Sequence, residues 1–266
     1  MTQKEALATL QEFPDREKHL RHITRYSLYP VMWYRTNLWI HSRRVAWIVG
    51  EIALSAQQVF GNTFDPLKAI FAALVHDDAE IITGDIQLGN KSNMNPQQLN
   101  VLQLQEREAV QQLVKQFPSH VSGYEYKALL LDAIDKNSLE AIVVAWADKY
   151  DGFCEALHEL YAGHALWATE IVNEYGTAPL PTDLYSRYFQ EFTHQFPKSV
   201  ALFECNNSWL RIPPWPNAQQ VIQNRKPHSV TSLLHQTGYV PYDQWIALTF
   251  TNGTQEDITG LYTKKE

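Results

Sequence analysis

The most informative part of the sequence is the stretch Phe71-Ala-Ala-Leu-Val-His76-Asp77-Asp78-Ala-Glu80, which continues as Ile-Ile-Thr83-Gly84-Asp85. It places a histidine beside an acid within an apolar segment, and both side chains can reach one metal ion, through a ring nitrogen and a carboxylate oxygen. On a helix, Glu80 would lie one turn further along the same face. The alternative is a capped helix end with a solvated acidic cluster. The metal-site interpretation is favoured only if other segments of the chain supply further ligands.

The composition indicates a globular protein with one large domain. Of 266 residues, 45% are hydrophobic, which is enough for a substantial core. The net charge of −7 argues against a polymeric nucleic-acid partner, because phosphate-backbone binding needs a basic face, whereas a single nucleotide in a local basic pocket is compatible with it. Two cysteines are too few for a disulfide framework, and neither a signal peptide nor a membrane-spanning apolar run is present. We expect a soluble, cytoplasmic protein without a membrane partner.

Two other segments with helical periodicity supply candidate ligands. His41 shares an apolar stripe with Val45 and Ile48, where a lone histidine is more often a core residue than a ligand. Asp148 follows an almost uncharged run in a predicted helix over residues 138–163, and its helical neighbours are small and apolar. A carboxylate that points into a core needs a cation or a metal as its partner.

The helical pattern ends near residue 197. A long amphipathic helix is predicted after Pro96 and another over residues 182–196. Beyond them, residues 245–250 and 257–262 resemble two strands about an Asn-Gly turn. We therefore predict an all-α core over residues 1–197 and a mixed appendage over residues 198–266 that contains a β-hairpin.

One basic patch interrupts the acidic sequence before an aromatic segment at residues 26–39. It contains Arg16, Lys18, His19, Arg21, His22 and Arg25. For a charge run of this kind, a solvated helix with ion pairs is the commoner structure, and Arg25 is the exception that we consider for phosphate binding. The aromatic side chains serve either as core or as a wall for a base or sugar.

His41, His76, Asp77 and Asp148 together give two imidazoles and two carboxylates on three segments, a set suited to one divalent ion such as Mn, Co, Fe, Ni or Mg. This H…HD…D arrangement resembles the HD-domain metal-dependent phosphohydrolases, and within them the bacterial 5'-deoxynucleotidase branch. The resemblance covers about residues 18–165 and rests on the following text: Arg25-Tyr26, Pro30-Val-Met32, Arg35-Thr36, His41-Ser, His76-Asp77-x-x-Glu80-x-x-Thr83-Gly84-Asp85, Lys91, Ala147-Asp148 and Glu159-Leu-x-Ala162-Gly163.

The resemblance implies an all-α HD fold and a role for each matching residue. It implies four metal ligands, His41, His76, Asp77 and Asp148. Glu80 would orient or deprotonate the attacking water, and Arg25 would meet the phosphate. Tyr26, Asp85 and Lys91 would contact the substrate, with Asp85 near the sugar. The family pattern has Trp where this chain has Tyr26, and prolines where it has residues 87–90, so we expect only a modest preference for deoxyribose.

The function implied by this resemblance is that of a metal-dependent phosphomonoesterase, a 5'-nucleotidase-like enzyme that acts on a nucleoside 5'-monophosphate with metal-activated water. Its partner would be a small nucleotide, and a homodimer is compatible with it. Two alternatives remain open: an HD-fold nucleotide or metal-binding regulatory module without turnover, and a hydrolase of nucleoside triphosphates or cyclic nucleotides that uses the same centre. Glu80 favours an enzyme, because a pure sensor has no evident need for an acid one turn beyond the ligands.

Overall fold

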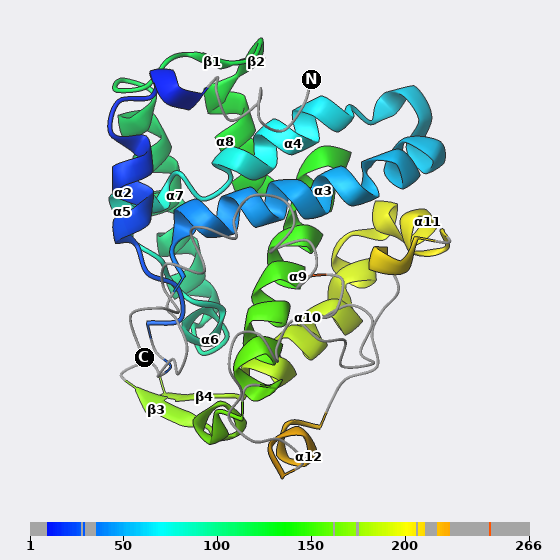
Figure 1. Cartoon of the computed structure of the whole chain (residues 1–266). Coiled ribbons are helices and arrows are strands. Elements are labelled where there is room, and N and C mark those ends of the chain that lie inside the picture. The colour runs from blue at the N-terminus through cyan, green and yellow to red at the C-terminus, as the bar shows by residue number, and fades with distance from the viewer. Residues whose placement is uncertain are drawn as a thin grey trace.

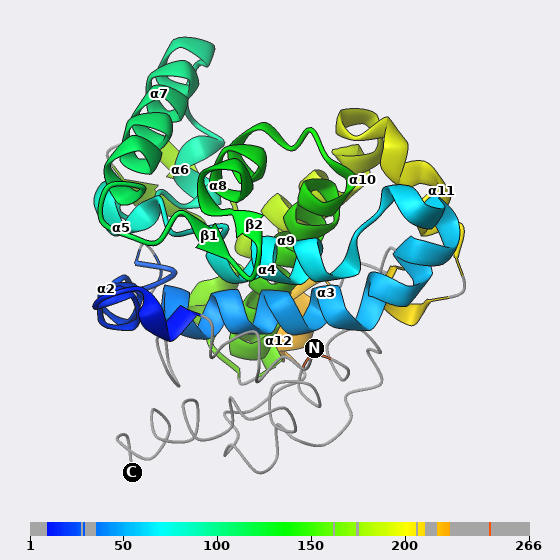
Figure 2. The same cartoon turned by 90° about the horizontal axis from the view of Figure 1, so that it is seen from above.

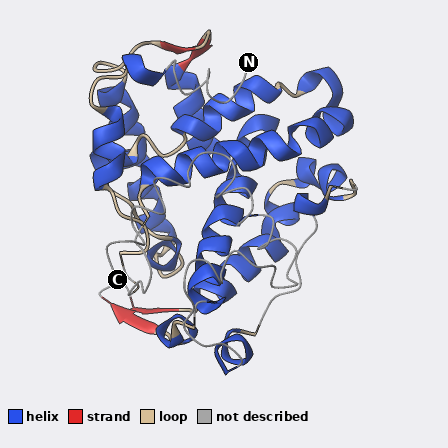
Figure 3. Ribbon diagram, viewed as in Figure 1, coloured by secondary structure: helices blue, strands red, loops and turns tan. Residues whose placement is uncertain are grey.

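The computed structural model is predominantly helical (Figures 1 and 3). It describes residues 10–27, 29, 36–161, 163–173, 176–205, 207–210, 217–223 and 245. The helices are η1 (Leu10–Glu12), α2 (Arg16–His22), α3 (Leu38–Phe60), η2 (Gly61–Thr63), α4 (Pro66–Val75), α5 (Glu80–Thr83), α6 (Leu88–Lys91), α7 (Pro96–Leu113), α8 (Tyr126–Asp135), α9 (Leu139–Tyr161), η3 (Ala165–Ala168), α10 (Pro181–Gln195), η4 (Pro197–Ser199), α11 (Val200–Phe203), η5 (Ser208–Leu210) and α12 (Ala218–Gln223). The prediction of an all-α core is confirmed.

The long helices α3 and α9 form the centre of the molecule, and α4 packs against both of them (Figure 1). Their contact surfaces are apolar, with Val45, Ile48 and Val49 of α3 and Ala69 and Ala73 of α4 fully buried. The alanines of α4 keep its backbone close to its neighbours, because a small side chain leaves little to separate two helices. This three-helix junction is where the candidate ligands meet.

Side chains of the preceding residues fix where these helices begin. Asn37 accepts a hydrogen bond from the backbone of Ile40 at 3.1 Å and caps α3. Asp65 caps α4 in the same way and is followed by Pro66, whose ring is compatible with the first turn. At α7, Asn95 forms a reciprocal capping box with Gln98. These caps fix the starts of α3 and α4, and with them the positions of His41 in the first turns of α3 and of His76 at the end of α4.

The central motif differs from the predicted continuous helix. Helix α4 ends at Val75, residues 76–79 form a turn, and α5 begins at Glu80. Within this turn, Asp78 is completely buried and accepts hydrogen bonds from Arg16 at 2.7 and 2.8 Å and from the Tyr126 hydroxyl at 2.8 Å. Because these contacts hold Asp78 inward, the preceding His76 and Asp77 face α3 and α9.

Only part of the basic patch is a solvated helix surface. Arg21 forms an exposed i,i+4 pair with Glu17, as expected. For Arg16 the expectation is wrong, since its side chain is 2% exposed and its guanidinium is paired with Asp78. Helix α2 ends at His22, so Arg25 lies in the segment that follows it, and its side chain pairs with Glu155 of α9.

Two small antiparallel hairpins interrupt the described helices (Figure 3). Strands β1 (His120–Val121) and β2 (Tyr124–Glu125) pair in the first, with Val121 opposite Tyr124. Strands β3 (Ile171–Asn173) and β4 (Gly176–Ala178) pair in the second, with Val172 opposite Thr177. The predicted strands at residues 245–250 and 257–262 lie outside the described residues, apart from Trp245.

The last described helices cover the core from outside. Helix α10 packs along α9, α11 and η5 contact α3, and α12 contacts α9 and η3. Figure 2 shows α7 standing at one corner, away from α11 and α12. A division into domains near residue 197 stays a prediction. Among the described helices, none has both the length and the apolarity needed to cross a membrane.

Candidate metal centre and active site

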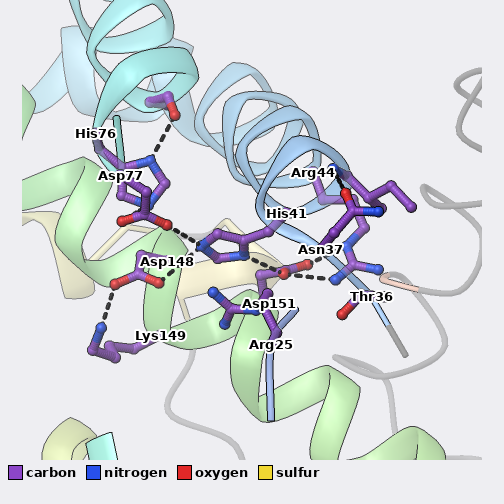
Figure 4. A network of polar contacts seen from close by, with 12 residues as sticks. Arg25, Thr36, Asn37, His41, Arg44, His76, Asp77, Asp148, Lys149 and Asp151 are labelled. Atoms are coloured by element: carbon purple, nitrogen blue, oxygen red, sulfur yellow. Dashed lines mark hydrogen bonds and ion pairs between the residues drawn. The ribbon is translucent and has the colours of Figure 1, made fainter. Parts of the chain in front are cut away.

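The four predicted ligands converge at the junction of α3, α4 and α9 (Figure 4). The Nε2 atom of His41 lies 3.3 Å from Oδ2 of Asp77 and 3.2 Å from Oδ1 of Asp148. The Nε2 atom of His76 lies 3.2 Å from Oδ1 of Asp77. One potential ligand atom from each of His41, His76 and Asp148 lies within 4.8 Å of the others. The sequence-predicted set is therefore brought together from three helices.

Both imidazoles present a nitrogen that suits a metal. The Nδ1 atom of His76 donates to the carbonyl of Ala73 at 2.7 Å, and Nδ1 of His41 donates to Asp151 at 2.8 Å. The other ring nitrogen, Nε2, is buried in each residue and has no hydrogen-bond partner in the described structure. A histidine whose Nδ1–H is satisfied by an oxygen offers its Nε2 lone pair to a metal ion. The residues present thus fit a divalent cation.

The charges of the centre also favour a cation. Burial alone would raise the pKa values of Asp77 and Asp148, but neighbouring positive groups, His76 for Asp77 and Lys149 for Asp148, lower both below the ordinary range. Burial and Arg25 lower the pKa of His41, yet its close contacts with the carboxylates of Asp148, Asp151 and Asp77 raise it overall to about 10. The site therefore stabilises positive charge at Nε2, which a metal ion supplies in place of a proton.

Behind His41 lies a buried ion-pair network that the sequence analysis did not identify. Arg44 donates to both carboxylate oxygens of Asp151, at 2.7 and 2.9 Å, and lies 2.8 Å from Oε1 of Glu155. Trp245 donates to Oδ1 of Asp151 at 2.8 Å. His41, Asp151 and Glu155 also have the composition of a metal cluster, but their two carboxylates are already paired with the two guanidinium groups of Arg44 and Arg25. We interpret this group as the support that orients the His41 ring.

A cavity of about 420 Å³ is lined by three of the four predicted ligands, His76, Asp77 and Asp148. Its walls come from the segment after α2, from the turn after α4 and from α5–α10, so segments far apart in the sequence share one space. Its lining includes His76, Asp77, Glu80, Asp85, Leu99, Leu102, Ile134, Asp148 and Leu184, together with the cations Arg25, Lys91, Lys136 and Lys149. Mixed apolar walls with a few converging charged groups are typical of a small-molecule site.

Two acids lie in this cavity outside the ligand set. Burial, Asp77 and Asp85 raise the pKa of Glu80 well above its ordinary value, and its buried Oε2 has no hydrogen-bond partner among the described residues. Burial likewise raises the pKa of Asp85, with Arg25 acting against it. A raised carboxyl pKa beside a metal centre is a property of general acid–base groups.

The other predicted substrate residues line the same cavity. Arg25 donates to Oε2 of Glu155 at 3.0 Å, and its side chain is 12% exposed. Lys91 lies at 3.4 Å from Glu106. Tyr26 has a left-handed backbone, and its hydroxyl bonds to the Gly152 carbonyl and, at 2.7 Å, to the Tyr185 hydroxyl. These contacts fix Tyr26 in the wall.

Sequence reasoning missed three residues on α9 and α10 that line the cavity. Lys149 follows the predicted ligand Asp148, and that adjacency was the only signal for it. Tyr185 and Tyr188 come from α10, which reads as an ordinary amphipathic helix. Their role in the wall depends on how α10 packs against α9, which periodicity alone does not give.

A helical fold whose His and Asp residues meet beside a cavity containing Arg25 and Glu80 is that of the HD-type phosphohydrolases. Residues 13–175, more than half of the chain, match the model of the family described as 5'-deoxynucleotidase YfbR-like, and the chain belongs to this family. The predicted resemblance, fold class and enzyme class are confirmed at this level. The individual roles of the site residues stay predictions.

Several bacterial relatives are similar to this chain. A 5'-deoxynucleotidase of Vibrio cholerae is 27% identical over 132 residues, which are 50% of this chain and 66% of the relative. One of Pectobacterium atrosepticum is 29% identical over 149 residues, 55% of this chain and 73% of the relative. The chain thus spans just under two thirds of the length of the first of these relatives and somewhat more of the second. A conserved hypothetical protein of Pyrococcus furiosus has a TM-score of 0.47 and 18% identity, covering 73% of this chain and 96% of that one.

Proposed function

We propose that this protein is a divalent-metal-dependent phosphohydrolase that releases phosphate from a nucleoside 5'-monophosphate. The observation that carries the proposal is the pair of buried Nε2 atoms of His41 and His76, which make no hydrogen bond and lie 3.2–3.3 Å from carboxylate oxygens of Asp77 and Asp148. His76 and both carboxylates line a cavity that also contains Arg25 and Glu80. The relatives named as 5'-deoxynucleotidases support the same reaction class.

His41, His76, Asp77 and Asp148 would hold the ion, for which Mn and Co are among the candidates. A divalent ion bound there would lower the pKa of water from about 15.7 toward 7 and would offset the charge of the phosphate. All other contributions come from the chain itself. The Asp151 carboxylate keeps the proton of His41 on Nδ1, so that Nε2 stays available.

Glu80 would take a proton from the attacking water. It lies in the cavity directly after the turn that carries His76 and Asp77, and burial, Asp77 and Asp85 raise its pKa well above the ordinary value. A carboxylate with a raised pKa is a stronger proton acceptor than an ordinary one. Arg25 would contact the phosphate oxygens, because its guanidinium is fixed by Glu155 and lines the cavity. Asp85 would face the sugar hydroxyls.

A modest preference for deoxyribose is part of the proposal. Discrimination against a 2'-hydroxyl requires a bulky group near the sugar, and Tyr26 is smaller than the Trp of the family pattern. Its hydroxyl is also engaged by Gly152 and Tyr185, which holds the ring in the wall. We expect both ribo- and deoxyribonucleoside 5'-monophosphates to be hydrolysed, with the deoxy forms preferred several-fold at most.

Phosphate release across a nucleotide panel tests this function. Paired ribo- and deoxyribonucleoside 5'-monophosphates should release phosphate in the presence of Mn²⁺ or Co²⁺ and not after chelation. Nucleoside 3'-monophosphates, triphosphates and a cyclic dinucleotide serve as controls. Cleavage of triphosphates or the cyclic dinucleotide without cleavage of monophosphates would contradict the proposal and favour the alternative hydrolase. A cytoplasmic location and a homodimer stay predictions.

A further inference from the structure

Lys149 is a cation that lines the cavity and has no part in the function proposed above. It follows Asp148 on α9, and its ammonium forms an ion pair with Oδ2 of that carboxylate (Figure 4). Its Nζ lies 5.8 Å from the ring centroid of Tyr188, and its side chain is 26% exposed. The aromatic ring therefore holds the ammonium beside the metal centre and within the cavity.

The other cations of the cavity have different partners. Arg25 is paired with Glu155 and Lys91 with Glu106, and neither of these carboxylates is a predicted metal ligand. Lys149 instead shares Asp148 with His41. When an ion takes up Asp148, the ammonium of Lys149 loses much of its counter-charge while it remains inside the cavity. A partly buried cation in this position needs an anion.

Lys136 adds to this excess of positive charge. It lines the same cavity from the end of α8, and its ammonium contacts the carbonyl oxygen of Ile134 at 3.4 Å. No carboxylate pairs with it in the part of the chain that the structure describes. Lys91, Lys136 and Lys149 line one cavity, and burial together with the charges of Lys149 and Lys91 lowers the pKa of Lys136.

We propose that Lys149 binds the phosphoryl group of the substrate, exchanging its ion pair with Asp148 for a phosphate oxygen when the metal is in place. This inference rests on the proposed function and adds a phosphate-binding residue to it. The phosphate would then be contacted by Arg25, from the segment after α2, and by Lys149, from α9. The ligand class is a phosphate dianion, whose charge two cations and a metal ion can match.

A purely structural role for Lys149 makes the opposite prediction for metal binding. If Lys149 only orients the Asp148 carboxylate, its removal weakens the metal. If Lys149 instead competes with the metal for Asp148, its removal leaves metal affinity unchanged or raises it, and the loss falls on phosphate. The two roles therefore predict opposite changes in metal affinity, and only the phosphate-binding role predicts a specific loss of phosphate affinity.

The experiment uses Lys149→Met, which keeps much of the aliphatic stem, with Lys149→Arg as the conservative variant and Lys115→Met, at an exposed position, as the control. Mn²⁺ is titrated into the metal-free proteins by calorimetry, and inorganic phosphate is then titrated into the Mn²⁺-saturated proteins. We expect Lys149→Met to bind Mn²⁺ at least as tightly as the unmodified protein and to bind phosphate about 10- to 100-fold more weakly, the usual scale for a charged hydrogen bond. Lys149→Arg should recover most of the phosphate affinity, and Lys115→Met should match the unmodified protein.

Phosphate affinity of Lys149→Met within about threefold of the unmodified protein would overturn the proposal, whatever happens to Mn²⁺ binding. Thermal unfolding of each variant identifies a loss of fold. If Lys149→Met does not fold, Lys149→Gln replaces it as the uncharged variant, and phosphate binding that is retained in Lys149→Arg but lost in Lys149→Gln supports the assignment. Both titrations work without turnover. Failure of the nucleotide panel would therefore refute the proposed function alone, and unchanged phosphate binding would refute the role of Lys149 alone.

Discussion

Replacing Asp151 by Asn tests whether the buried network behind His41 supports the metal centre. Each oxygen of Asp151 accepts two donors: Oδ1 from Arg44 and Trp245, and Oδ2 from Arg44 and His41. In Asn, an NH₂ group replaces one of the two carboxylate oxygens. In either orientation of the amide, this donor faces N–H groups that have lost their acceptor. Facing His41, the NH₂ group favours the tautomer whose Nε2 carries the proton and cannot bind metal. Facing Arg44, it leaves a buried cation with less compensation.

The magnitude follows from these contacts. Breaking a buried ion pair by removing one partner costs about 3–5 kcal/mol. Arg44 keeps its contact with Glu155 at 2.8 Å, so we expect the lower end, a loss of about 3 kcal/mol in the free energy of unfolding of the metal-free protein. A residue that orients a metal-bound histidine typically contributes 10- to 100-fold to metal affinity, so Mn²⁺ affinity should fall by about that factor.

Urea unfolding of the metal-free protein and calorimetric titration with Mn²⁺ measure the two effects. Asp135→Asn is the matched control, because Asp135 pairs with Arg107 at the surface, where such pairs contribute about 1 kcal/mol or less. An Asp151→Asn protein that keeps both its unfolding free energy and its Mn²⁺ affinity would refute the supporting role.

The effect of Asp151→Asn on stability should depend on pH. Burial alone would raise the pKa of Asp151, but Arg44 and His41 lower it below its ordinary value. A carboxyl whose pKa is depressed by folding contributes stability above its unfolded pKa of about 3.9 and loses that contribution as the pH falls toward the folded value. The difference in unfolding free energy between the unmodified protein and Asp151→Asn should therefore be largest near neutrality and shrink below about pH 4.

Three further changes have separate outcomes. Glu80→Gln should keep its fold and its bound metal while turnover falls about 100-fold or more, and unchanged turnover would favour the binding-module alternative. Asp78→Asn should lower the unfolding free energy by about 3–5 kcal/mol in urea titrations, because Arg16 loses its buried partner, and a loss below about 1 kcal/mol would contradict the anchoring of the ligand turn. Gly152→Ala would place a Cβ 2.7 Å from Cζ of Tyr185, so we expect the ring to move, stability to fall by about 1–3 kcal/mol and the KM for nucleotides to rise; an unaltered KM would show that this wall does not touch the substrate.

The metal ligands were accessible from the sequence because each carries a local signal. His76 and Asp77 are adjacent in an apolar segment, and Asp148 interrupts an uncharged helix where a carboxylate needs a partner. The structure gives Asp148 two such partners, His41 and Lys149. His41 was the least distinctive of the set, since an apolar stripe suits a core histidine equally well.

The supporting contacts were not accessible because they join residues far apart in the chain. Arg16 and Asp78 are separated by 62 positions, and His41 and Asp151 by 110, so neither spacing nor periodicity relates them. The two hairpins were missed for another reason: strands of two or three residues are too short to show an alternating pattern. The break between α4 and α5 likewise arises from tertiary contacts of Asp78.

The proposed active site requires one divalent ion held by His41, His76, Asp77 and Asp148. The decisive measurement compares the unmodified protein with Asp77→Ala, determining bound Mn²⁺ per chain and phosphate release from a deoxyribonucleoside 5'-monophosphate on the same samples. We predict one ion per chain with phosphate release in the unmodified protein, and loss of both in Asp77→Ala with the fold retained. An Asp77→Ala protein that still binds one ion and still releases phosphate would contradict the assignment of the centre.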